Sequence, residues 1–206
     1  MKTIKITKQD LLFGAINGLI FGALLPIVLK SFNVTGMPPY IITVLFFMLL
    51  ASVGVYIGYL LSKFKSFFFQ LAKFGATGAA NFAIDIGVLA LLVFFFYAAS
   101  SEIPTTSFAL FKIISFALAT INSYLWNKFW SFNNKDAENV AGEFGKFILV
   151  SSVGIIINVS IAATVNSLHN YISIDPKTWA AVSAMVGAIA TLTWNFLGYK
   201  LIVFKK

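Results

Sequence analysis

Six long apolar runs follow one another along the chain, and polar residues gather in the segments between them. A helix needs about 20 apolar residues to cross the hydrocarbon core of a bilayer. Backbone polar groups cannot stay unpaired in lipid, and a β-barrel would need short alternating segments instead of long runs. The pattern therefore predicts an all-α polytopic membrane protein with six transmembrane helices, over Leu11–Leu29, Tyr40–Ser62, Phe74–Tyr97, Ser107–Asn127, Phe147–Leu168 and Thr178–Tyr199.

The composition favours a bilayer as the solvent of this chain. Of its 206 residues, 59% are hydrophobic and 11% are charged, and the mean hydropathy is +0.90. A typical soluble domain has about 25% charged residues, and a small soluble fold keeps much of its surface in water. The chain has no cysteine and a single histidine, His169. We therefore expect no disulfide and no metal centre. The sequence has no phosphate-binding loop and no Ser/His/Asp set, so we also expect no other cofactor and no enzymatic activity.

The lysines predict how the chain crosses the membrane. The net charge is +8, and all fifteen basic residues are lysine. Three of the lysines are assigned to one side of the membrane, namely Lys30, Lys112 and Lys177. The other twelve are Lys2, Lys5, Lys8, Lys63, Lys65, Lys73, Lys128, Lys135, Lys146, Lys200, Lys205 and Lys206. The positive-inside rule places these twelve, and both termini, on the cytoplasmic side of the cell membrane. Membrane topology explains the basic excess, so we expect no nucleic-acid partner.

Two segments of the chain are similar to each other. Lys73-Phe74 and Asp85 recur at an offset of 73 residues as Lys146-Phe147 and Asn158. The segment 123–132 aligns with 195–204 at an offset of 72. We interpret residues 71–132 and 144–204 as two copies of one helical hairpin. Each copy has two spans, so the copies are parallel repeats.

The repeat divides the chain into two predicted domains. Residues 1–70 form an N-terminal two-helix transmembrane extension, and residues 71–206 form a four-helix transmembrane domain. The segment 59–67 shares six of nine residues with 124–132, so the N-terminal hairpin is a candidate third copy. Chance similarity among lipid-facing residues is the other interpretation.

The four-helix region resembles the GtrA-like family. The residues that carry the resemblance are Lys73-Phe74, Gly78, Asn81, Asp85, Asn127-Lys128-Phe129-Trp130-Ser131-Phe132, Lys146-Phe147, Gly154, Asn158, Trp194-Asn195, Lys200 and Phe204. Two positions depart from the family pattern, which often has a second basic residue at Phe129 and an asparagine at Tyr199. The resemblance implies a small membrane protein of cell-surface polysaccharide synthesis or cell-wall glycosylation. It also implies a flippase for polyprenyl-phosphate-linked sugars that works beside glycosyltransferases.

Asp85 is the one acidic residue inside a predicted span. It follows Lys73 by twelve residues, which is about 18 Å along a helix and near the middle of the bilayer. Asn81 and Thr77 precede it at four-residue spacing, so the three share one helix face. A charge at this depth costs several kcal/mol unless it is paired or hydrated. One interpretation is a groove for a sugar or phosphate head group, and the other is a structural Asp satisfied by a neighbouring helix.

Counting inward from the far surface places possible partners of Asp85 on the next helix. Thr120 and Asn122 are expected near its level. Lys112 is expected closer to the far surface, where it can snorkel, so an ion pair with Asp85 needs a bend or a long reach. Each asparagine either contacts a ligand or makes an interhelical hydrogen bond.

The second copy carries related polar residues at Asn158 and Asn195. Lys128 and Lys200 occupy equivalent helix ends on the predicted cytoplasmic side. Positive-inside topology explains them, and contact with the phosphate of a lipid is the second interpretation.

Three functional hypotheses follow. The first is a flippase that passes the head group of a polyprenyl-phosphate-linked sugar along a groove containing Asp85, Asn81, Asn122 and Asn158, while the prenyl tail stays among membrane lipids. The second is a noncatalytic membrane partner that docks a glycosyltransferase through its basic loops. The third is a proton-coupled exporter of small molecules such as cations, which rests on Asp85 alone.

Overall fold

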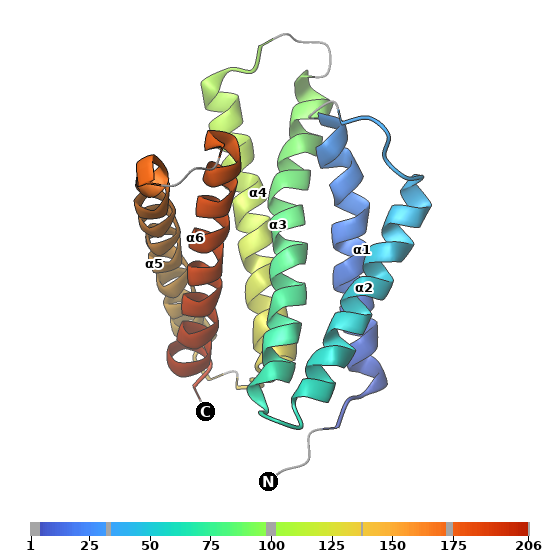
Figure 1. Ribbon diagram of the computed structural model, residues 1–206. Coiled ribbons are helices and arrows are strands. Elements are labelled where there is room, and N and C mark those ends of the chain that lie inside the picture. Colours follow the sequence, from blue (N-terminus) through green and yellow to red (C-terminus); the bar gives the residue numbers. More distant parts are fainter. Residues whose placement is uncertain (1–4, 32–33, 98–101, 137, 172–174, 206) are drawn as a thin grey trace. The chain divides into compact units, whose positions relative to one another are not determined.

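The computed structural model describes residues 5–31, 34–97, 102–136, 138–171 and 175–205, and every regular element in them is a helix (Figure 1). The long helices are α1 (Lys8–Ser31), α2 (Tyr40–Leu61), α3 (Phe67–Tyr97), α4 (Thr105–Trp126), α5 (Val140–Ser167) and α6 (Pro176–Gly198). Three short helices are η1 (Asn127–Ser131), η2 (Leu168–Tyr171) and η3 (Tyr199–Val203). Six helices are long and apolar enough to cross a membrane. The predicted all-α fold with six transmembrane helices is confirmed.

Loop residues set where several helices begin. The extended backbone of Pro39 and Pro104 directly precedes α2 and α4. Asn139 caps α5 by accepting a hydrogen bond from the backbone N–H of Gly142 at 2.9 Å. Asp175 caps α6 in the same way, and Pro176 follows at the first helical position, where its missing N–H costs nothing. The polar segments between the apolar runs therefore supply the helix caps.

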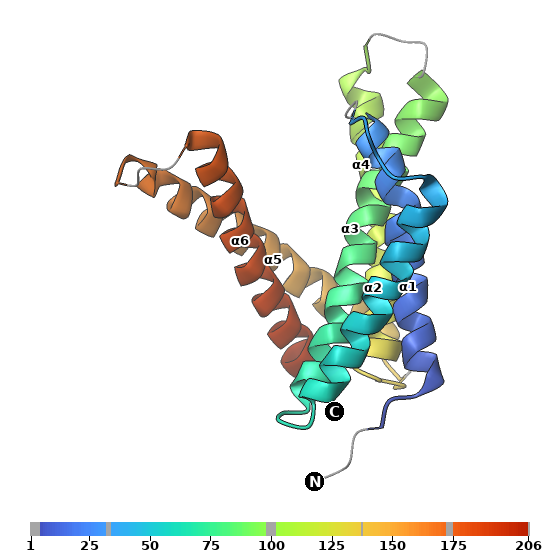
Figure 2. The same cartoon turned by 45° about the vertical axis from the view of Figure 1, so that its right-hand side comes forward.

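The chain forms two compact units, residues 1–133 and 134–206. In the first unit, α1 packs on α2 and α3, and α4 packs on the other side of α3 (Figure 1). In the second unit, α5 and α6 form an antiparallel hairpin, which is seen in both views (Figures 1 and 2). We call the end of the first unit that holds the start of α1 and η1 its proximal end. The end that holds the α1–α2 loop is its distal end.

Glycines bring α1 and α2 into close contact. Gly14, Gly18 and Gly22 recur at four-residue spacing, so they lie on one face of α1, and this face meets α2. A Cβ atom on Gly18 would overlap the backbone of Phe47, and one on Gly22 would lie 2.9 Å from the Cα of Val44. Small residues at a helix interface let two backbones approach in lipid. The close approach of the two backbones at these glycines therefore helps to hold the N-terminal hairpin together.

Gly18→Ala is expected to lower the free energy of unfolding by about 1–3 kcal/mol, because α1 and α2 must move apart to admit the methyl group. Thermal unfolding of the purified protein in detergent measures the effect. Gly54→Ala on α2 is the matched control, since a Cβ there meets nothing within 4 Å. A Gly18→Ala melting temperature equal to that of Gly54→Ala would contradict the close packing.

The two predicted copies end in the same local structure. Each of α4 and α6 continues into a five-residue π-helical turn, η1 and η3, whose first residues are 72 positions apart. The turns close with the same bond, from Phe132 N–H to the Asn127 carbonyl at 2.9 Å and from Phe204 N–H to the Tyr199 carbonyl at 2.7 Å. The helix α2 ends with no such turn at Leu61. The N-terminal hairpin therefore lacks a feature that the two copies share.

A buried polar cluster lies at the proximal end of the first unit, beside the aromatic core around Phe69 and Trp130. Its centre is Asp10, in the first turn of α1 and 7% exposed. Thr7 donates its N–H and hydroxyl to Oδ2 of Asp10 at 2.9 and 2.7 Å, while the hydroxyl oxygen of Thr7 accepts from the Asp10 N–H. Lys73 of α3 pairs with Oδ1, and Trp130 of η1 donates its Nε1–H to the same oxygen at 3.2 Å. Asp10 therefore ties the N-terminal hairpin to α3 and η1.

Candidate functional site

A line of polar side chains joins α3 to α4 inside the apolar spans of the first unit. We call Asn81, Asp85, Lys112, Ser115 and Asn122 the polar ladder. Asn122 donates its Nδ2–H to Oδ1 of Asn81, and Lys112 forms an ion pair with Oδ2 of Asp85. Ser115 donates its hydroxyl to Oδ1 of Asp85 at 2.9 Å. Asn81 and Asp85 lie one turn apart on α3, so all of these contacts run along one face of that helix.

The register between α3 and α4 differs from the sequence-based expectation. The partners of Asp85 are Lys112 and Ser115, whereas Asn122 meets Asn81 and not Asp85. Thr120 makes none of these contacts. The helices have 31 and 22 residues, so depths counted inward from opposite surfaces do not meet at the same level. The long Lys112 side chain then reaches Asp85 without a break in either helix.

The ion pair is open on one side. The side chain of Asp85 is 24% exposed and that of Lys112 is 43% exposed, whereas Ser115 is fully buried. Two partly exposed charges inside hydrocarbon would cost several kcal/mol unless water or another polar group reached them. This face of α3 and α4 is therefore suited to water or to a polar ligand and poorly suited to lipid chains.

Thr77, which the sequence placed on the same face as Asn81 and Asp85, has a different environment. It is fully buried, and its hydroxyl has no hydrogen-bond partner among the residues that the structure describes. It therefore lies outside the polar ladder.

The second unit carries amide side chains near the repeated positions of the ladder, without its charges. Asn195 on α6, which corresponds to Ser123 at the 72-residue offset, packs against Gly154 on α5, which follows Asn81 by 73 positions. The Oδ1 atom of Asn195 is buried, with no hydrogen-bond partner in the described part of the chain. Asn158, the counterpart of Asp85, is half-buried one turn beyond Gly154. The position 72 residues after Lys112 is Ala184, so the second unit has no equivalent of the Asp85–Lys112 ion pair.

Each unit holds its own set of the predicted polar residues. Asn81, Asp85 and Asn122 come together within the first unit, and Asn158 and Asn195 belong to the second. A groove that includes residues from both units stays a prediction.

Lys128 and Lys200 occupy matching places in the two π-helical turns. Each is the second residue of its turn, and each lies over the aromatic ring four residues before it. The Nζ atom of Lys128 is 5.7 Å from the ring centroid of Tyr124 and 3.4 Å from its hydroxyl oxygen. The Nζ atom of Lys200 is 5.7 Å from the ring centroid of Phe196. Lys128 is 2% exposed and Lys200 is half-buried, so Lys200 is the more accessible of the two.

Two residues that make buried polar contacts, Ser115 and Asp10, were not identified from the sequence. Ser115 follows Lys112 by three residues, a spacing that places both on one helix face and could have identified it. Asp10 follows Thr7 by three residues, the spacing of a helix capping box. That pattern identifies the capping role of Asp10 but gives no sign of its contacts with Lys73 and Trp130.

Comparison with known proteins finds a family that is similar to the four-helix region. The GtrA/DPMS transmembrane domain matches residues 73–204. No curated protein and no solved structure matches the chain significantly. The family match covers both copies of the repeat and four of the six candidate membrane spans, so the resemblance seen in the sequence is confirmed. The protein is a multi-pass membrane protein that belongs to the GtrA/DPMS transmembrane-domain family.

Proposed function

We propose that the protein moves a polyprenyl-phosphate-linked sugar across the cytoplasmic membrane, to supply cell-surface polysaccharide synthesis or cell-wall glycosylation. Membership of the GtrA/DPMS family fits membrane proteins related to polyprenyl-phosphate sugars. The observation that carries the proposal is the partly exposed Asp85–Lys112 ion pair between two apolar helices. In this role the chain is a transporter and not an enzyme, and both termini lie on the cytoplasmic side.

The ladder offers the groups that a sugar phosphate needs inside a membrane. Hydroxyl groups of the sugar can exchange hydrogen bonds with the carboxylate of Asp85 and with the amides of Asn81 and Asn122. The phosphate carries negative charge, which the ammonium group of Lys112 can compensate as a point charge. A phosphate that binds Lys112 takes the place of Asp85 as its anionic partner, while the carboxylate of Asp85 keeps the hydrogen bond from Ser115 and can accept hydrogen bonds from the sugar.

We assign further polar residues to the path of the head group, because they also can form hydrogen bonds with the sugar or compensate the phosphate charge. Asn158 and Asn195 provide amides in the second unit, near the positions related to the ladder by the repeat. Lys200 and Lys128 stand at the helix ends where the phosphate would enter, and the accessible Lys200 is the better placed of the two. The prenyl tail remains among the membrane lipids throughout, because an apolar chain gains nothing from a polar path.

Transport by the purified protein in liposomes tests this proposal. Short-chain polyprenyl-phosphate sugars, each carrying a different sugar, are added to one leaflet, and their arrival in the other leaflet is measured. We expect the protein to accelerate the movement of at least one of them over empty liposomes. Phosphatidylcholine with the same reporter serves as the lipid control. No acceleration with any member of the panel, or equal acceleration of phosphatidylcholine, would contradict the proposal.

Two further experiments distinguish this function from the alternatives. If the protein instead docks a glycosyltransferase, Asp85→Asn leaves co-purification of the enzyme unchanged. Substitution of Lys63 and Lys65 in the α2–α3 turn then prevents this co-purification. Export of a small cation predicts a dependence on Asp85 with no movement of lipid. Either result would replace the flippase proposal.

A further inference from the structure

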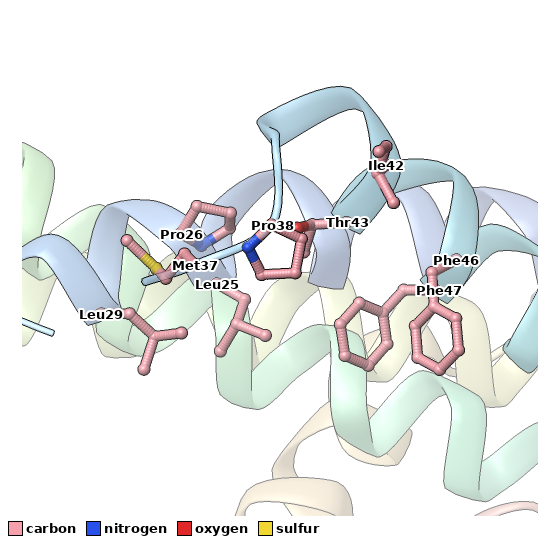
Figure 3. Close-up of a pocket in the computed structure, with 9 residues that line it drawn as sticks. All are labelled: Leu25, Pro26, Leu29, Met37, Pro38, Ile42, Thr43, Phe46 and Phe47. Atoms are coloured by element: carbon pink, nitrogen blue, oxygen red, sulfur yellow. The ribbon is translucent and has the colours of Figure 1, made fainter. Parts of the chain in front are cut away.

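An apolar pocket lies between α1 and α2 at the distal end of the first unit (Figure 3). Its volume is about 350 Å³. Three of the labelled residues come from α1 and four from α2, with two from the loop between them. The residues that line it are Leu25, Pro26, Leu29, Met37, Pro38, Ile42, Thr43, Phe46 and Phe47. None of them belongs to the polar ladder or to the family match, which begins at residue 73.

The pocket exists because the α1 face changes from small to large residues. Close contact with α2 lasts as far as Gly22, and the next residues on that face are Leu25, Pro26 and Leu29. Their side chains keep the two backbones apart. Pro26 also lacks the N–H that would bond to the carbonyl of Gly22. One residue further, the carbonyl of Ala23 accepts a hydrogen bond from the Tyr40 hydroxyl at 3.1 Å. The distal part of the hairpin is therefore both wider and anchored.

A second cavity adjoins the pocket and gives it a polar mouth. Its volume is about 500 Å³, and it shares Pro26, Met37 and Pro38 with the pocket. It is also lined by Lys30, the exposed lysine in the last turn of α1. An apolar chamber thus opens beside a positive charge at the end of a membrane-spanning helix. This arrangement is complementary to a lipid that has an apolar chain and an anionic head group.

The pocket is separated from the polar ladder by α3. Gly87 of α3 faces α1, because a Cβ there would lie 2.9 Å from the Cβ of Leu24. Asp85, two residues earlier on α3, contacts α4 instead. Residues two apart on an α-helix are separated by about 200° of rotation around the helix axis, so they point to nearly opposite sides. A molecule in the pocket therefore lies across α3 from the candidate transport path, which favours a resident lipid over the transported one.

We propose that the pocket holds one acyl chain of an anionic phospholipid, whose phosphate pairs with Lys30. This site goes beyond the proposed flippase function and does not depend on it. The lipid fills the space that large residues open between α1 and α2, and its head group binds at the end of α1. The site belongs to the N-terminal extension and so distinguishes this chain from the four-helix region alone.

Native mass spectrometry of the full-length protein, titrated with dioleoylphosphatidylglycerol or dioleoylphosphatidylcholine, tests the site. We expect the wild type to prefer the anionic lipid by about fivefold. Lys30→Gln should bind both lipids equally. Leu25→Trp and Ile42→Trp fill the pocket from α1 and from α2, and each should remove one bound lipid. Leu45→Trp, on the exposed part of α2, is the matched control and should bind as the wild type does.

Two pocket variants keep the test valid if one of them fails to fold, which circular dichroism detects. Unchanged binding to a folded pocket variant, or an unchanged preference in Lys30→Gln, would overturn the proposal. Displacement of bound phosphatidylglycerol by a polyprenyl phosphate at equal concentration would make the carrier lipid the occupant and would also overturn it.

Discussion

Replacement of Lys112 by methionine is expected to slow translocation of a polyprenyl-phosphate sugar by about tenfold, because an uncompensated charge inside a membrane costs several kcal/mol, part of which the partial exposure of the pair screens. The substitution removes the cation that compensates the phosphate and leaves Asp85 without its ion-pair partner. Asp85→Asn is expected to slow translocation as well, since the ammonium group of Lys112 then lacks its carboxylate. Initial rates of leaflet exchange in liposomes measure both effects.

The double variant Asp85→Asn with Lys112→Met distinguishes a working pair from two independent residues. If the two act as a unit, the double variant is no slower than the slower single variant. Thr193→Val is the matched control, because Thr193 is exposed in a span and its hydroxyl donates to the Ile189 carbonyl of its own helix, at 2.9 Å. Rate losses that simply multiply, or an equal loss in Thr193→Val, would contradict a joint role of Asp85 and Lys112.

Asp10→Ala is expected to lower the free energy of unfolding by about 3–5 kcal/mol, as breaking a buried ion pair does. The substitution leaves Lys73 without a counter-ion and Trp130 without its acceptor, and it removes the capping box with Thr7. Because these contacts join α1 to α3 and η1, the N-terminal hairpin should separate from the rest of its unit first. Thermal unfolding in detergent, followed by tryptophan fluorescence near Trp130, measures the change.

A second substitution at Lys73 tests whether the uncompensated charge causes the loss of stability in Asp10→Ala. Adding Lys73→Met to Asp10→Ala removes the uncompensated charge and should recover part of the lost stability. Glu138→Ala removes an exposed acidic side chain and should change the melting temperature little. The structural role of Asp10 would be refuted by a melting temperature that falls no further in Asp10→Ala than in Glu138→Ala.

The spans were predictable because lipid imposes a simple length rule on apolar runs. Their ends were less so, since α3 begins at Phe67 and α5 at Val140, both outside the apolar runs. The residues before Lys73 and Lys146 continue the helices beyond the length that the hydrocarbon requires. The π-helical turns at Asn127 and Tyr199 were not predictable, because no residue type marks a five-residue turn in the way that proline or glycine marks other turns.

All members of the polar ladder except Ser115 were singled out from the sequence, but not all of its contacts were predictable. The rarity of charge in the spans pointed to Asp85, and the four-residue spacing pointed to Asn81. The pairing of Asp85 with Lys112 depends on the register between two helices of unequal length, which a single sequence does not encode in a readable pattern. Asp10 was overlooked because it precedes the first apolar run and has the spacing of a common helix cap.

A flippase of this kind brings the head group of the lipid into contact with the polar ladder inside the membrane. Photocrosslinking with a polyprenyl-phosphate sugar that carries a diazirine on the sugar tests it most directly, with the labelled peptides identified after digestion. We predict labels on α3 and α4 between residues 81–85 and 112–122, reduced by excess unlabelled lipid and lost in the Asp85→Asn, Lys112→Met double variant. Labels confined to the loops or to α1 and α2, with the ladder unlabelled, would contradict the account.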